Sequence, residues 1–245
     1  MEYDSLLSVI KRRRSIRSYR PDPVPTEDIM KVLEAARWAP SGNNSQPWEF
    51  VVVRSREKMR QVVGIFAEQS ERLRKYSDNF KHAPNKSYLL NAAALVFVCG
   101  DPRFKSAYPR SSSDQEMAKM YRENAENIYI ETVSAAVCNI ILAATSLGLG
   151  TVWLTGSAES ITGRQLKVAL KVPEALDILC CIPLGYPSSD KPSPRTPRPL
   201  EDVVHFDEFD DKKWRSDEDV KRFVGEPHVW SEFYRAGRIP SVVSQ

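Results

Sequence analysis

Residues 128–147 constrain the fold more than any other segment, because small and apolar side chains occupy nearly every face of the helix they predict. Such a helix needs covering on all sides, so we expect it to be buried all round. Gly148-Leu149-Gly150 is a typical helix ending. A 245-residue chain covers such a helix more readily by dimerisation than alone. We read no run of about 18 apolar residues, as a membrane span requires.

The remaining pattern alternates helices and strands in an α+β order. A short helix is expected over residues 6–14, and a helix capped by Thr26 stops near Pro40. Residue type and periodicity predict strands over 48–53, 93–100, 151–154 and 177–184, and helices over 56–76 and 158–170. The charged stretch 102–124 is interpreted as a mobile, solvated insertion of the kind that forms a lid.

The carboxyl-terminal region differs from the rest in composition. The proline-rich run 187–199 must be extended. The polar residues from 207 onward include too few apolar side chains for a core of their own. We therefore predict one domain over residues 1–206, followed by an extension over 207–245.

Charge and cysteine usage narrow the function classes. A net charge of +3 is too small to indicate a nucleic-acid-binding protein. The four cysteines lie in apolar runs without C-x-x-C spacing, so we interpret them as buried reduced thiols, which suits the cytoplasm. None of the three histidines lies beside a nucleophile or a second ligand. We therefore expect no metal site, no hydrolytic triad, and no nucleic-acid or membrane partner.

The first chemically distinctive segment gathers three guanidinium groups and a hydroxyl within five positions: Arg13, Arg14, Ser15 and Arg17. Arginine presents a planar fork of donors that meets phosphate oxygens two at a time, and serine adds a short hydrogen bond. This arginine box therefore suits a phosphate. A solvated basic helix end, or a nucleic-acid patch over residues 12–20, accounts for the same composition.

Two further segments suit a polar or flat ligand. The loop from Ala39 to Trp48 places five polar side chains beside a glycine, although Asn and Ser also satisfy their own backbone in an ordinary turn. Residues 148–156 leave the apolar helix, pass through a short strand and open backbone amides ahead of the next helix. Such amides can donate to the electron-rich atoms of a conjugated ring. A helix cap followed by a strand gives the same pattern.

In this order and spacing, the three segments resemble the family of nitroreductases that depend on flavin mononucleotide (FMN), over roughly residues 5–205. The family has a branch of dehalogenases related to iodotyrosine deiodinase. The resemblance implies a central, mainly antiparallel sheet flanked by helices, in a domain-swapped homodimer with FMN at the subunit interface. It places the arginine box on the FMN phosphate and ribityl end, and the segment after Gly150 along the flavin ring. The A-P-S-G loop then reaches the flavin from the partner subunit.

The cofactor-binding residues implied by the resemblance are Arg13, Arg14, Ser15, Arg17, Pro40, Ser41, Gly42, Asn43, Trp153, Leu154, Thr155 and Gly156. A final arginine usually precedes the family's P-L-[ED] sequence and returns to the phosphate. Pro197 stands at that position, so Arg195 or Arg198 must substitute.

The implied activity is electron transfer from NADH or NADPH to a small conjugated acceptor, such as a nitroaromatic or a quinone, by a ping-pong mechanism. Flavin N5 carries the chemistry, so no catalytic side chain is required. A reductive dehalogenase is the alternative. That branch holds a zwitterionic substrate with Glu, Tyr and Lys; Lys86 matches the lysine, but Gln61 and Ile65 stand at the other two positions.

Three other interpretations stay open. Lys86 is equally explained as a solvated surface charge. Another branch of the family supplies flavin chemistry to benzimidazole synthesis. In a different class, the basic residues 12–20 would form the surface of a non-catalytic binding module.

Overall fold

The computed structural model describes residues 2–76, 86–106, 114–188 and 197–225. They belong to two compact units, Met1–Asp190 and Lys191–Gln245. The helices of the first unit are α1 Glu2–Arg12, α2 Thr26–Arg37, α3 Arg56–Tyr76, α4 Gln115–Ser146 and α5 Ser160–Leu170. The domain extent predicted from the sequence, residues 1–206, stays a prediction.

Three antiparallel strands form one sheet in the order β1-β2-β3, with bounds β1 Trp48–Val53, β2 Ala94–Gly100 and β3 Asp177–Leu184. β1 and β2 are rich in the β-branched and aromatic residues that fit a pleated sheet. In the register, Val51 pairs with Phe97 and Val96 pairs with Ile182. The structure confirms the α+β class and the antiparallel sheet predicted from the sequence.

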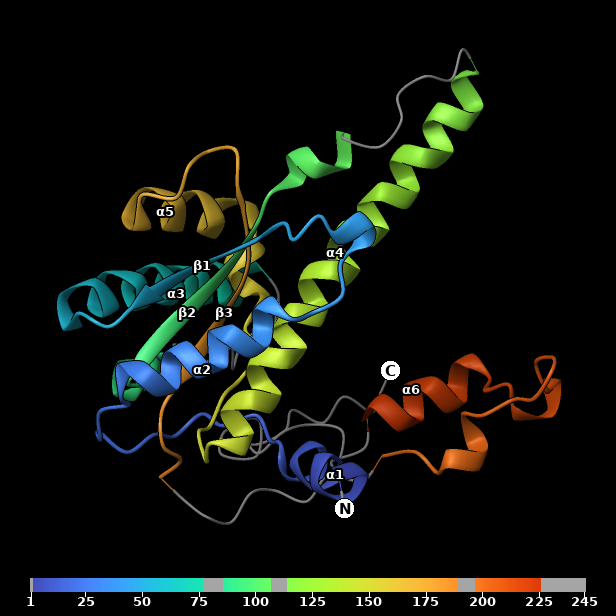
Figure 1. The fold of residues 1–245 in the computed structure, drawn as a ribbon, viewed down its shortest axis with the longest axis horizontal. Coiled ribbons are helices and arrows are strands. Elements are labelled where there is room, and N and C mark those ends of the chain that lie inside the picture. The colour runs from blue at the N-terminus through green and yellow to red at the C-terminus, as the bar shows by residue number, and fades with distance from the viewer. Residues whose placement is uncertain (1, 77–85, 107–113, 189–196, 226–245) are drawn as a thin grey trace. The chain divides into compact units, whose positions relative to one another are not determined.

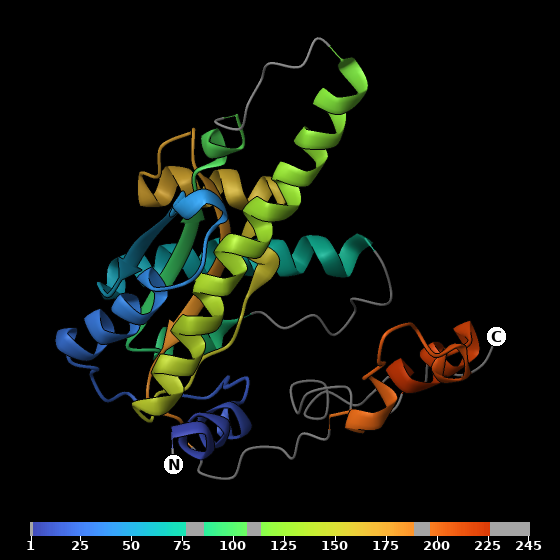
Figure 2. The ribbon, with the colours of Figure 1, turned by 45° about the vertical axis from the view of Figure 1, so that its right-hand side comes forward.

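Helices cover both faces of the sheet (Figures 1 and 2). On one face, α2 and α4 enclose a core cluster that includes Val96 and Val98 of β2. On the other face, α3 and α5 enclose a second cluster that includes Leu95 and Phe97. Because successive side chains of a strand point to opposite faces, the fully buried β2 supplies both cores.

The α4 helix is longer than the sequence predicts. It begins at Gln115, so residues 115–124 are helical rather than part of a solvated insertion. The Asp114 carboxylate caps the first turn by accepting hydrogen bonds from the backbone N–H groups of Glu116 (2.9 Å) and Met117 (3.3 Å). An N-terminal cap followed by good helix formers explains why this polar stretch is ordered as a helix. At the start of the predicted insertion, Pro102–Ser106 form a 3-10 helix, and residues 107–113 lie outside the described residues.

The sequence predicts that α4 is buried all round, but the described part of one chain leaves one side of it exposed. Ala136 and Ile140 are completely buried, whereas Ile130 is 43% exposed and Cys138 is also exposed. By length and composition alone, α4 is apolar enough to cross a membrane, although the apolar runs of the sequence predict no such span. The central helix of a folded domain meets the same criterion, and one face of α4 belongs to the first core cluster.

Residues 151–154 do not form the predicted strand. Two isolated bridges, Gly150 with Gly185 and Leu154 with Cys181, tie this segment to β3 and the residue that follows it. Between the bridges, the Thr151 carbonyl accepts a hydrogen bond from a residue near the amino terminus instead of from a neighbouring strand. The ladder is therefore interrupted.

In the second unit, the described elements are the 3-10 helices Leu200–Asp202 and Asp211–Lys213 and the helix α6 Asp217–Gly225. The rings of His205 and Phe209 stack with centroids 4.2 Å apart, and Trp214 meets Phe209 edge-on. The polar composition from residue 207 onward did not indicate this small aromatic cluster. Most of the proline-rich run 187–199 lies outside the described residues.

Gly100 leaves space for a buried tyrosine, which gives a test of the core. A Cβ at residue 100 would lie 2.8 Å from Tyr129 Cζ, and Tyr129 is 1% exposed. Because the ring cannot move away, we expect Gly100→Ala to lower the free energy of unfolding by about 1–3 kcal/mol in urea denaturation.

Gly64→Ala is the matched control for this substitution. A Cβ at residue 64 meets nothing within 4 Å, and alanine is favoured over glycine inside a helix such as α3. We therefore expect a gain of about 0.5–1 kcal/mol at this position. Equal destabilisation by the two substitutions would contradict the packing described for Tyr129.

Candidate functional site

The arginine box lies beside the segment that follows α4. Ser15 and Thr151 form an isolated parallel bridge, and within it the Ile16 backbone N–H donates to the Thr151 carbonyl at 2.8 Å. The bridge joins segments that are far apart in the sequence. Two of the three segments predicted to hold the cofactor are therefore neighbours within one chain.

Ile16 is held in place from two sides. The buried Tyr19 hydroxyl donates to the Ile16 carbonyl at 2.7 Å, and burial raises the pKa of Tyr19 well above its ordinary value. On the other side, a Cβ at Gly150 would come within 2.8 Å of Ile16 Cγ2. Glycine at position 150 therefore allows the two segments to approach closely.

The side chains of the arginine box surround one stretch of backbone. Arg13, Arg14 and Arg17 are half-buried, whereas Ser15 is exposed. Arg14 Nη1 donates to the Arg13 carbonyl at 2.8 Å, and Arg17 Nη1 donates to the Ser15 carbonyl at 3.3 Å. Arg17 also hydrogen-bonds Tyr88. The box thus concentrates three positive charges next to the Thr151 segment.

Residues 153–156 continue from this segment along β3. Leu154 exchanges two backbone hydrogen bonds with Cys181, at 3.1 and 3.0 Å, and the 3-10 helix Thr155–Ala158 follows. Trp153 is 38% exposed. Within the part of the chain that the structure describes, the backbone N–H groups of Thr155 and Gly156 donate no hydrogen bond. They are therefore available to acceptor atoms of a ligand.

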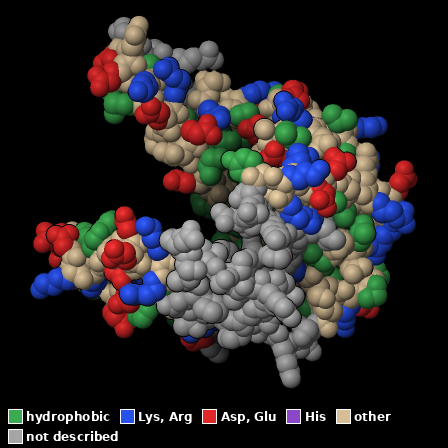
Figure 3. Space-filling model, turned by 180° about the vertical axis from the view of Figure 1, so that it is seen from behind, with side chains coloured by type: hydrophobic (Ala, Val, Ile, Leu, Met, Phe, Trp, Pro, Cys, Tyr) green, Lys and Arg blue, Asp and Glu red, His purple; other side chains and the backbone are tan. Residues whose placement is uncertain are grey.

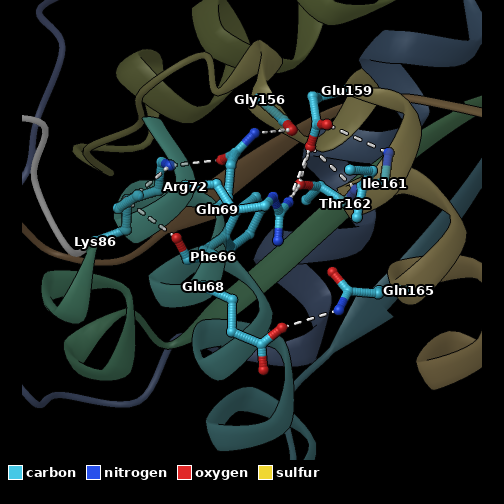
Figure 4. Close-up of polar contacts among 11 residues, drawn as sticks. Phe66, Glu68, Gln69, Arg72, Lys86, Gly156, Glu159, Ile161, Thr162 and Gln165 are labelled. Atoms are coloured by element: carbon cyan, nitrogen blue, oxygen red, sulfur yellow. Dashed lines mark hydrogen bonds and ion pairs between the residues drawn. The ribbon is translucent and has the colours of Figure 1, made fainter. Parts of the chain in front are cut away.

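Gln69 is a site residue that the sequence interpretation missed. Its side chain, only 3% exposed, reaches from α3 to the backbone of the Gly156 segment, where Nε2 donates to the Gly156 carbonyl at 2.6 Å (Figure 4). Gln69 follows Val62 and Phe66 at helical spacing on the buried face of α3. A polar residue on an apolar helix face was the available signal.

Lys86 contacts the Gln69 side chain and is half-buried, so it is not the solvated surface charge that one interpretation proposed. Its Nζ donates to Gln69 Oε1 at 2.7 Å and lies 5.2 Å from the centre of the Phe66 ring (Figure 4). Burial, together with the nearby Arg74 cation, lowers the pKa of Lys86 to about 8. A contact between Lys86 and a substrate stays a prediction. Of the other two positions considered for substrate contacts, Gln61 is exposed and hydrogen-bonded to Lys58.

The loop that contains Pro40, Ser41, Gly42 and Asn43 packs elsewhere. The Gly42 N–H donates to Thr132 Oγ1 of α4 at 3.3 Å. In Figures 1 and 2 this loop lies against the middle of α4, whereas α1, which leads into the arginine box, lies at its carboxyl-terminal end. Among the described residues, no hydrogen bond links the loop to either of the other two segments. One chain therefore does not bring all three segments together.

The last arginine of the predicted phosphate site is not placed. Arg195 lies outside the described residues. Arg198 belongs to the second unit, where its Nη2 donates to the Asp202 carbonyl at 2.9 Å. The roles of both arginines stay predictions.

Positive and negative side chains are mixed on the face of the molecule that Figure 3 shows, where the Lys and Arg side chains of the described residues are interspersed with Asp and Glu side chains. Over the described ranges, no group of three or more His, Cys, Asp and Glu side chains could hold a metal ion.

Comparison with known proteins identifies the family. The sequence model of the nitroreductase family matches residues 10–186, which contain the arginine box, the Ser41 loop and the Gly156 segment. The chain belongs to the nitroreductase family. Over 188 residues, this family member is 35% identical to a protein of Archaeoglobus fulgidus with the provisional name NADH dehydrogenase/NAD(P)H nitroreductase, covering 77% of the chain and 88% of the relative.

Two further relatives mark the range of the family. The iodotyrosine deiodinase of Thermotoga neapolitana is 29% identical over 214 residues, which cover 83% of this nitroreductase-family chain and 98% of the relative. The structure of an FMN-dependent nitroreductase from Clostridium difficile R20291 superposes with a TM-score of 0.61 at 25% identity, covering 83% of this chain and 99% of that one. Both comparisons agree with the resemblance read from the three segments.

Glu159 fixes the end of the Gly156 segment and gives a test of this local structure. Its carboxylate caps α5 by accepting from the Thr162 backbone N–H at 3.1 Å, and it pairs with Arg72 Nη2 at 3.1 Å (Figure 4). Burial alone would raise the pKa of Glu159, but the hydrogen bonds from Thr162, Ile161 and Arg72 outweigh it and lower the pKa from 4.5 to about 2.

Because this pKa is lowered on folding, the ionised Glu159 stabilises the protein fully above about pH 4.5, and this contribution is lost as the pH falls towards 2. We expect Glu159→Gln to destabilise the protein near neutral pH and the difference from the parent to shrink on acidification. Thermal unfolding of both proteins from about pH 6 to about pH 3 measures it. A difference that stays constant over this range would show that ionisation of Glu159 is not involved.

Proposed function

We propose that this chain is an FMN-dependent oxidoreductase that passes electrons from NADH or NADPH to a small conjugated acceptor. The observation that carries the proposal is the bridge between Ser15 and Thr151. It sets the cationic arginine box beside Thr151, and the amides of Thr155 and Gly156, which donate no hydrogen bond among the described residues, follow a few residues further along that segment. FMN has matching ends, an anionic phosphate and a flat ring.

The residues present fit this cofactor. Arg13 and Arg17 would hold the phosphate, because guanidinium groups form strong charge-assisted hydrogen bonds to phosphate oxygens. The amides of Thr155 and Gly156 would face ring atoms that become electron-rich on reduction. The exposed part of Trp153 would lie beside the ring. FMN, when bound, supplies the two-electron chemistry between the nicotinamide and the second substrate.

A homodimer completes this proposal, with Ser41 reaching the FMN held mainly by the partner subunit. The Ser41 loop packs on α4, where the Gly42 N–H donates to Thr132 Oγ1, and no hydrogen bond among the described residues joins it to the arginine box of its own chain. The same helix exposes apolar side chains, with Tyr121 48% and Ile130 43% exposed. A second subunit packed along α4 would cover these side chains.

A reductive dehalogenase is the second candidate function. It is favoured by the similarity to iodotyrosine deiodinases and by the half-buried Lys86 ammonium. Within the described part of the chain, the Lys86 ammonium has two hydrogen-bond partners, the Gln69 amide and the Ser70 hydroxyl, so one of its three N–H groups would serve a substrate carboxylate. Supplying a nitroaromatic and an iodinated tyrosine in parallel to the pre-reduced protein separates the two candidates, because only the acceptor that is used restores the flavin absorbance.

The first prediction from this proposed function concerns the residues that would bind the FMN phosphate. Replacing Arg13 or Arg17 by Ala removes a charged hydrogen bond worth about 1.5–3 kcal/mol, so FMN should bind about tenfold more weakly or worse. Arg12→Ala is the control, because it removes the same charge from the exposed last residue of α1. Fluorescence titration measures the three affinities. Unchanged affinity in both site variants would reject the assignment.

The second prediction concerns the dimer. Ile130→Arg places a charge on the exposed apolar face of α4 and should yield monomers with reduced FMN occupancy. Val168→Arg is the control on α5, where Val168 is 81% exposed and should tolerate the charge. Sedimentation velocity with detection at the flavin band reports mass and occupancy together. A monomer that retains full FMN occupancy would contradict the shared site.

The third prediction is kinetic. One pocket would serve both substrates in turn, so double-reciprocal plots should give parallel lines, the pattern of ping-pong kinetics. If backbone amides support the ring, Gly156→Pro should slow flavin reduction far more than Thr155→Val, in variants that fold and bind FMN. Anaerobic stopped-flow bleaching of the flavin band with NADH or NADPH tests this. Intersecting lines, or equal slowing by the two substitutions, would count against it.

A further inference from the structure

The Gln69 side chain forms the polar link between Lys86 and the backbone at Gly156. It comes from the buried face of α3, and both ends of its amide are used: Nε2 donates to the Gly156 carbonyl at 2.6 Å, and Oε1 accepts from Lys86 Nζ at 2.7 Å (Figure 4). A buried amide without partners would be costly, so these two contacts define how the side chain sits.

The partners of Gln69 allow only one orientation of its amide. A lysine ammonium donates hydrogen bonds and accepts none, whereas a backbone carbonyl only accepts. If the amide were flipped, its NH₂ group would face the Lys86 ammonium and its oxygen would face the Gly156 carbonyl, and both contacts would be repulsive. Lys86 therefore keeps the donor end of Gln69 directed at Gly156.

The hydrogen bond from Gln69 acts as a clamp on the Gly156 carbonyl, and Gly156 is a position where a clamp matters. Glycine has the greatest backbone freedom of any residue, so its peptide group turns easily unless something holds it. Among the described residues, its carbonyl otherwise accepts only a long hydrogen bond, 3.4 Å, from the Glu159 N–H. A side chain at position 156 would also exclude the clamp, because a Cβ there would lie 2.8 Å from Gln69 Oε1.

We propose that Gln69, oriented by Lys86, is a positioning residue that fixes the Gly156 peptide group at the ring end of the cofactor site. The inference rests on the proposed function. Lys86 then acts on the protein, through Gln69, rather than as a substrate contact alone. The Gly156 carbonyl belongs to the Gly156–Ser157 peptide, so holding it towards α3 fixes that peptide plane on one side of the Gly156 amide that would face the flavin.

Gln69→Leu and Gln69→Glu test this role. Leucine fills the buried space but cannot donate, and glutamate keeps an acceptor for Lys86 but turns an oxygen towards the Gly156 carbonyl. Gln165→Leu is the matched control, because Gln165 lies on the neighbouring α5 and its amide donates to Glu68 instead. Lys86→Met provides a second route: it leaves the Gln69 amide in place but removes the cation that orients it.

The first readout uses protein without FMN. Hydrogen exchange of the Glu159 amide, whose N–H shares the Gly156 carbonyl with Gln69, should become about tenfold faster or more in Gln69→Leu and Gln69→Glu, and faster in Lys86→Met. The control should exchange as the parent does. Parent-like exchange in both Gln69 variants would overturn the clamp, and so would equal acceleration in Gln165→Leu.

The second readout uses the FMN-loaded protein. The rate of flavin reduction by NAD(P)H should fall about tenfold or more in both Gln69 variants, while FMN affinity changes by less than about threefold, because the phosphate contacts remain. Parent-like reduction rates in both Gln69 variants would overturn the positioning role. If the parent protein itself fails to bind FMN, the proposed function fails, whereas the exchange measurement still decides whether Gln69 holds Gly156.

Discussion

The backbone hydrogen bond from Ile16 to Thr151 is the contact on which the candidate site depends. Neither segment belongs to the three-stranded sheet. Gly150 lets the two backbones approach, and Tyr19 holds the Ile16 carbonyl from the opposite side. The site is therefore assembled from loops, but each loop is anchored on a buried core element, as is usual for functional sites.

The same core explains how the distant end of the site is built. β3 supports Leu154 through two backbone hydrogen bonds, and α3, packed on the same face of the sheet, supplies Gln69. Lys86 enters from the segment before β2 and sets the Gln69 amide. Glu159 closes the short helix and starts α5. Together these contacts give the Gly156 segment a defined backbone, which amides facing a cofactor need before they can stabilise charge.

Much of this architecture could be predicted from local patterns. β1, β3, α3 and α5 lie close to their expected bounds because periodicity and terminal residues are local properties. The amino-terminal part of α4 was missed because its cap, Asp114, precedes a polar stretch without apolar periodicity. The strand expected over residues 151–154 is replaced by isolated bridges, one to β3 and one to the segment at Ser15, which the local pattern of residues does not reveal. The arginine box could be predicted as a phosphate site because its residues are adjacent in the sequence. Gln69 could not, because its hydrogen-bond partner, the Gly156 carbonyl, lies 87 positions away in the sequence.

The central claim is that the arginine box and the Gly156 segment together hold FMN. Its most direct test is the flavin content of the purified full-length protein, before and after incubation with excess FMN and removal of the unbound cofactor. The account predicts a yellow protein with flavin absorbance bands that releases about one FMN per chain on denaturation. A folded protein that remains colourless, and that cannot be loaded with FMN, would contradict the account.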